Sequence, residues 1–122
     1  MPGILISGGQ YSSDSVEVFN PSTGDSCVLP SLPDERNGHT MNNMTICGGY
    51  YSTSTCITFT SGVWVTSHVL VQDRYAHSSW GTKDGDIMIL GGGNQATDTT
   101  TETITPGDYD SQPGFTLHTW TR

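Results

Sequence analysis

Charged side chains are scarce in this sequence, and basic ones are the scarcest. Charged residues make up 13% of the 122 residues, with 4 Lys and Arg against 12 Asp and Glu, and the formal net charge is −8. Affinity for nucleic acid rests on Lys and Arg contacts to phosphates, so this balance argues against a nucleic-acid partner. The acidity itself is consistent with a soluble surface.

Long hydrophobic runs and short chemical motifs are also missing. No stretch of eighteen apolar residues occurs, so we expect no membrane-spanning helix. Met1 leads directly into a predicted strand, so we expect no signal peptide in this chain, and a secreted protein would have its true N-terminus outside it. The H-x-x-x-H and C-x-x-C spacings, the phosphate-binding glycine loops and the G-x-S-x-G elbow are all absent. We therefore predict no metal, no cofactor and no catalytic residue in this chain.

One short pattern occurs three times. Ile4–Gly9, Met44–Gly49 and Ile87–Gly92 each consist of a short apolar run that ends in two glycines. The copies are about forty residues apart, a period typical of solenoids and propellers. The runs have strand length, and glycine pairs permit a sharp corner and a close approach of other backbone. Gly8, Gly9, Gly48, Gly49, Gly91 and Gly92 are therefore predicted to form a repeated structural corner.

Two further elements follow all three corners in the same order, and a third further element follows the first two corners. The second element is an alternating run closed by a Pro or Gly turn, in the segments Val16–Gly24, Cys56–Gly62 and Glu102–Gly107. The third is a short apolar run, in the segments Ser26–Leu29, Val63–Thr66 and Phe115–His118. The fourth begins at a histidine three residues after an arginine, in the segments His39–Met41 and His77–Trp80. Each repeat is thus predicted to hold four short antiparallel strands, as one propeller blade does.

At this point the sequence resembles the kelch repeats. The resemblance rests on the double glycines, on Phe19 and Phe59 in the second element, on Trp64 in the third, and on Arg36 and Arg74 before the next blade. It covers nearly the whole chain, although Cys27 stands near a usual tryptophan position and Ile104 replaces the aromatic residue in the third copy. The narrower likeness is to extracellular kelch proteins with galactose-oxidase-like propellers.

The resemblance implies an all-β fold, namely part of a kelch-type β-propeller. We expect about two complete four-stranded antiparallel blades plus a three-stranded remainder in a single region, residues 1–122. The expected units are a partial blade at 1–35, a second blade at 36–73 and a third at 74–121. Because kelch propellers have more blades, the chain is interpreted as a fragment of a larger one. Closure through oligomerisation is the alternative.

The resemblance also frames the functional hypotheses. The first is a non-catalytic scaffold or recognition module that binds a protein or a glycan. The alternative is a fragment of a galactose-oxidase-like copper oxidase whose active residues lie outside this chain. His39 and His77 occupy equivalent repeat positions, so we predict that they, with Arg36 and Arg74, bind backbone groups at the blade junctions rather than a metal.

Partner binding is predicted on the loops that follow the glycine corners. In a propeller such loops gather on one face, and binding residues are often carried by loops on a rigid scaffold. Tyr11, Tyr50 and Tyr51 lie in these loops. Tyrosine is favoured at interfaces because it buries a ring while its hydroxyl can still form a hydrogen bond.

The cysteines and one sequon bear on the cellular compartment. If the segment from Gly48 to Thr55 joins adjacent antiparallel strands, Cys47 and Cys56 lie opposite one another, close enough for a disulfide. A Cys27–Cys47 bridge and unbridged buried thiols are the alternatives. Asn43-Met44-Thr45 is a glycosylation acceptor at a predicted turn. Together these features favour an extracellular protein or ectodomain.

Overall fold

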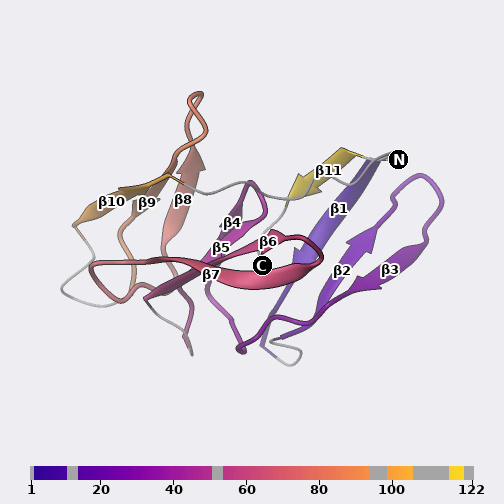
Figure 1. Cartoon of the computed structure of the whole chain (residues 1–122), viewed down its shortest axis with the longest axis horizontal. Coiled ribbons are helices and arrows are strands. Elements are labelled where there is room, and N and C mark those ends of the chain that lie inside the picture. Colours follow the sequence, from indigo (N-terminus) through magenta and orange to yellow (C-terminus); the bar gives the residue numbers. More distant parts are fainter. Residues whose placement is uncertain (1, 11–13, 51–53, 94–98, 106–115, 120–122) are drawn as a thin grey trace.

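The computed structural model describes residues 2–10, 14–50, 54–93, 99–105 and 116–119, which form eleven β-strands in three sheets. The first sheet contains β1 (Pro2–Ser7), β2 (Val16–Phe19), β3 (Ser26–Leu29) and β11 (Thr116–Thr119). The central sheet contains β4 (Thr40–Asn42), β5 (Thr45–Cys47), β6 (Thr55–Thr60) and β7 (Val63–Val69). The third sheet contains β8 (Ser78–Gly81), β9 (Ile87–Leu90) and β10 (Thr101–Ile104). Figure 1 shows the three sheets side by side.

The all-β prediction is confirmed, and the three copies of the glycine pattern form equivalent strands. β1, β5 and β9 each end next to a glycine pair, and each pairs antiparallel with the strand that follows it in the chain. The predicted unit 36–73 forms a four-stranded sheet, β4-β5-β6-β7, in which every neighbouring pair is antiparallel. The short elements after His39 and His77 form β4 and β8.

The prediction for the C-terminal strand is wrong. The segment Phe115–His118 was expected to be the outer strand of the third unit, next to β10. Instead β11 pairs in parallel with β1, with Ile4 opposite His118, so the first sheet has four strands and the third has three. In the described part of the chain, β1 pairs with β2 on one edge and with β11 on the other. The parallel pairing with β11 satisfies backbone groups on that second edge of β1.

The core consists of two layers, one on each side of the central sheet. Strand alternation sends Ile46, Ile57 and Phe59 of the central sheet toward Leu5, Val16 and Val18 of the first. The opposite face carries Cys47 and Cys56, which pack with Leu70 and with Ile87 and Ile89 of β9. All but Val18 and Phe59 of these side chains are less than 4% exposed. Both faces of β5 and β6 are therefore buried, whereas β7 at the edge of the central sheet is largely exposed.

Candidate functional site

The glycine corners have the same geometry in all three repeats. The first glycine has a φ of 61° at Gly8, 69° at Gly48 and 68° at Gly91, and the second glycine also has positive φ. Each first glycine donates its backbone N–H to a carbonyl at the start of the next strand, namely that of Ser15, Thr55 or Thr100. The predicted repeated corner is confirmed, and its backbone conformation is one that non-glycine residues rarely adopt.

The corners also connect neighbouring sheets. The N–H of Gly9 donates to the carbonyl of Arg36 at 3.2 Å, and the N–H of Gly49 donates to the carbonyl of Arg74 at 2.9 Å. A β-carbon on Gly48 would lie 2.3 Å from the Arg74 carbonyl oxygen. Glycine is thus required there because the backbone of the next repeat approaches too closely for a side chain.

Arg36 and Arg74 perform the same task at successive junctions. Arg36 is 0% exposed and donates from Nη1 to the carbonyls of Gly48 and Thr55, at 2.9 and 2.8 Å. Arg74 is 1% exposed and donates from Nη1 to the carbonyls of Gly91 and Thr100, at 2.7 and 3.0 Å. In both cases Nη2 also reaches the threonine hydroxyl. The geometry agrees with the prediction that these arginines bind backbone groups.

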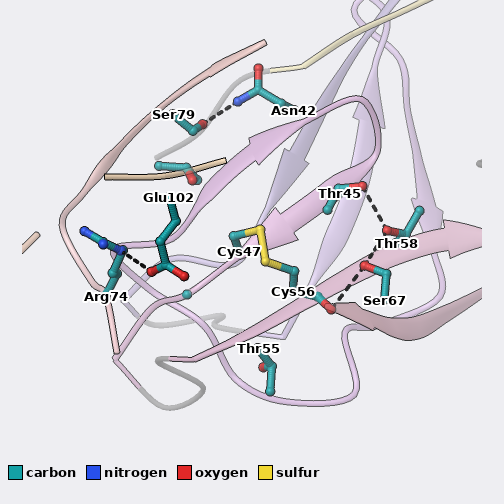
Figure 2. The surroundings of a disulfide bond; sticks show 12 residues. Asn42, Thr45, Cys47, Thr55, Cys56, Thr58, Ser67, Arg74, Ser79 and Glu102 are labelled. Carbon is teal, nitrogen blue, oxygen red and sulfur yellow. Dashed lines mark hydrogen bonds and ion pairs between the residues drawn. A yellow bond between two sulfur atoms is a disulfide. The ribbon is translucent and has the colours of Figure 1, made fainter. Parts of the chain in front are cut away.

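The two buried guanidinium groups differ in their acidic neighbours. Glu102, on β10, accepts a hydrogen bond from Nε of Arg74 at 2.8 Å, and this ion pair is visible in Figure 2. The second oxygen of Glu102 accepts from the N–H of Val71. For Arg36, burial lowers the pKa to about 10, while the charge of Asp34 acts in the opposite direction. Arg36 therefore remains positively charged at neutral pH.

His39 and His77 bind side chains of the preceding sheet. Nε2 of His39 lies 2.9 Å from Oγ of Ser7, and Nε2 of His77 lies 2.8 Å from Oγ1 of Thr40. Burial, assisted by the charge of Arg74, lowers the pKa of His77 to about 4, and the backbone of Cys47 acts in the opposite direction. His77 is therefore neutral at physiological pH. Each histidine thus contacts a hydroxyl group of the preceding sheet, and His77 also has the predicted kind of partner, the backbone of Cys47.

The disulfide predicted between Cys47 and Cys56 is present, and Figure 2 shows it bridging β5 and β6. The two residues lie directly opposite in the strand register. On the same face a chain of hydroxyl groups runs from Thr45 through Thr58 to Ser67, with contacts of 2.9 and 2.8 Å. The alternative pairing of Cys27 with Cys47 is wrong, because Cys27 is exposed and unbridged.

Two tyrosines lie next to the junction between the central and third sheets. The ring of Tyr50 stacks on that of Tyr75, with centroids 4.2 Å apart and planes tilted by 31°. Tyr50 is 56% exposed, and its backbone N–H donates to the carbonyl of Asn37. The hydroxyl of Tyr75 donates to the carbonyl of Gly93 at 3.3 Å. Tyr11 and Tyr51, also predicted to bind a partner, lie outside the described residues.

Tyr75 was not predicted as the stacking partner of Tyr50, and Glu102 was not predicted as the ion-pair partner of Arg74. Tyr75 directly follows Arg74 and lies across the junction from Tyr50, so only the packing of two repeats brings the rings together. A usable signal was the acidic residue at position 102, since the equivalent position of the central sheet is Ile57. A carboxylate within an otherwise half-buried strand indicates a charged partner.

Asn43, the predicted glycosylation residue, lies in the turn between β4 and β5. It has a φ of 48° and is partly exposed, and its carbonyl lies 3.5 Å from the hydroxyl of Thr45. Modification of its side chain stays a prediction. Among the described residues, no group of three or more His, Cys, Asp and Glu side chains is arranged to hold a metal ion. No helix within the described part of the chain is long and apolar enough to cross a membrane.

Comparison with known proteins gives no assignment. A scan against protein-family models finds no match to this chain, and a search of curated proteins finds no relative.

Proposed function

We propose that this chain is part of a kelch-type β-propeller that acts as a non-catalytic recognition module for a protein or a glycan. Three observations support the architecture: repeated positive-φ glycine corners, a buried arginine at each of two junctions, and sheets packed through both faces of the central one. The first two corners each contribute to the junction with the next sheet, which is the behaviour of a repeat array.

The observation that carries the binding role is the stacked pair Tyr50 and Tyr75. The exposed ring of Tyr50 packs against the ring of Tyr75, and the backbone of Tyr50 is fixed by the 2.9 Å hydrogen bond from its N–H to the carbonyl of Asn37. A ring that is already ordered loses little entropy when it binds, and tyrosine offers both an apolar face and a hydroxyl group. Such a surface suits the apolar face of a sugar ring or a side chain of a protein partner.

The proposed setting is extracellular or an ectodomain. The Cys47–Cys56 disulfide supports an oxidising compartment, and the sequon at Asn43 lies in a partly exposed turn. Mass spectrometry of the protein isolated from its natural source, without reduction, tests this proposal. An unmodified Asn43 together with three alkylatable thiols would contradict it.

Binding is tested with a labelled sample of the full chain on an array of oligosaccharides and on immobilised extracellular proteins. Tyr50→Ser should abolish the signals that the wild type gives, and Tyr50→Phe should retain most of the signals that depend on the ring. Val63→Ser is the matched control, because Val63 is 52% exposed on β7 and does not take part in the tyrosine pair. Equal binding by wild type and Tyr50→Ser would remove this surface as the binding site.

A further inference from the structure

The outer face of the third sheet repeats a face that is buried elsewhere in the chain. In the central sheet, Thr40 and Asn42 of β4 lie opposite Cys47 and Thr45 of β5. In the third sheet, Ser78 and Trp80 of β8 lie opposite Leu90 and Met88 of β9 in the same order. The strand register therefore makes Ser78, Trp80, Met88 and Leu90 equivalent to Thr40, Asn42, Thr45 and Cys47.

In the central sheet this face is covered by the third sheet. Thr40 is 7% exposed and Thr45 is 1% exposed. The side chain of Asn42 donates to the hydroxyl of Ser79, a contact that Figure 2 shows, and Thr40 contacts His77. In the third sheet the same face is open: Trp80 is 67% exposed and Met88 is 36% exposed. An exposed tryptophan beside an exposed methionine is typical of an interaction surface.

The first sheet presents the complementary face. By the alignment of the glycine corners, Ile4 and Ile6 are equivalent to Met44 and Ile46 of the central sheet, which are 3% and 0% exposed. They are also equivalent to Ile87 and Ile89, which are 1% and 0% exposed against the central sheet. Ile4 and Ile6 themselves are half-buried, and Val28, in line with Ile6 and Glu17 across the sheet, is 85% exposed.

We propose that the outer face of the third sheet, formed by Trp80, Met88 and Leu90, binds the outer face of the first sheet of a second copy of this chain. The chain already contains this kind of packing twice, from the first sheet to the central sheet and from the central to the third. The proposed contact continues that series with the next pair of equivalent faces. Because the two faces differ, the copies associate head-to-tail. They form a closed ring when the rotation from one sheet to the next allows the last copy to meet the first.

This inference rests on the repeat packing and does not depend on the proposed recognition role. It is tested by light scattering on size-exclusion chromatography over a range of concentrations. The wild type is expected to shift from monomer to a larger species as concentration rises. Trp80→Glu and Val28→Glu should each remain monomeric. Both substitutions are at exposed positions, so folding should be retained, which circular dichroism checks.

Mixing the two variants gives the decisive result. The Trp80→Glu chain keeps an intact first-sheet face, and the Val28→Glu chain keeps an intact third-sheet face, so the mixture should form one heterodimer although neither variant self-associates. Val63→Glu, an exposed valine on β7, should associate as the wild type does. A wild type that is monomeric at every concentration would overturn the proposal. So would a Val28→Glu chain that still self-associates, or a mixture that contains only monomers.

Discussion

Replacement of Gly48 by alanine probes the contact on which the central junction depends. Gly48 has a φ of 69°, and an added β-carbon would meet the Arg74 carbonyl oxygen at 2.3 Å and Cε1 of His77 at 2.6 Å. Gly24 is a matched control, because its φ is 80° but nothing lies within 4 Å of an added β-carbon. Both substitutions introduce backbone strain, and only the one at Gly48 also displaces the next repeat.

The expected magnitudes separate the two variants. A non-glycine residue in this left-handed conformation costs about 1–2 kcal/mol, and the reduced freedom of the unfolded chain returns about 0.4–1 kcal/mol. Gly24→Ala should therefore lower the free energy of unfolding by about 1 kcal/mol or less. At Gly48 the Arg74 carbonyl must also move away from the N–H of Gly49, its partner at 2.9 Å. Loss of that buried hydrogen bond adds about 1–3 kcal/mol, giving a total of about 1–4 kcal/mol.

Equilibrium unfolding in urea, followed by tryptophan fluorescence, measures both variants against the wild type. Trp64 is half-buried and donates from Nε1 to the carbonyl of Pro30, so its emission should report loss of packing between the first and central sheets. Gly48→Ala should shift the transition to clearly lower urea concentration than Gly24→Ala does. Equal losses for the two variants would refute the close-approach explanation and leave backbone strain as the whole effect.

Three further predictions concern the junctions. The pKa of His77 is lowered from 6.5 to about 4, so between these pH values the unfolded chain binds a proton that the folded chain does not. As pH falls through this window, the free energy of unfolding should therefore fall by up to about 3 kcal/mol. Urea titrations at each pH should show this loss for the wild type and a smaller loss for His77→Gln. The double variant Cys47→Ala, Cys56→Ala removes a disulfide that joins residues 9 apart in the sequence. Its free energy of unfolding in urea should be lower than that of the wild type by about 2–3 kcal/mol. An unchanged urea midpoint would contradict a stabilising role for the disulfide. Arg74→Lys should lower the free energy of unfolding, measured by calorimetry, by about 2–4 kcal/mol, because an ammonium group cannot reproduce the forked contacts of the buried guanidinium. A loss below about 1 kcal/mol would show that lysine can replace those contacts.

The repeats could be predicted from the sequence because their signals are local. A short apolar run that ends in two glycines carries strand length and corner geometry within six residues, and all three copies form the expected strand. The pairing of Cys47 with Cys56 is equally local, since it requires only that consecutive strands form a hairpin. Arg36 and Arg74 were predicted as junction residues because they recur at the same repeat position.

The remaining features depend on contacts between distant segments. The partner strand of β11 could not be predicted, because the sequence of residues 116–119 favours a strand but does not indicate which sheet that strand joins. Only the open edge of β1, more than a hundred residues earlier in the chain, decides the pairing. The stack of Tyr50 on Tyr75 likewise requires the packing of the central and third sheets.

The two junctions show which features the repeat keeps and which it varies. Both keep an arginine on the corner carbonyl and a histidine on a hydroxyl of the preceding sheet. The packed faces vary: the first junction is lined by aliphatic and aromatic side chains, and the second by a disulfide and isoleucines. Polar contacts with fixed directions therefore set the geometry from sheet to sheet, while apolar contacts only need to fill the space between them. A face that lacks these polar contacts, as the outer face of the third sheet does in the described structure, can still bind a second copy through Trp80 and Met88, but that association should be weaker than the internal junctions and should depend on concentration.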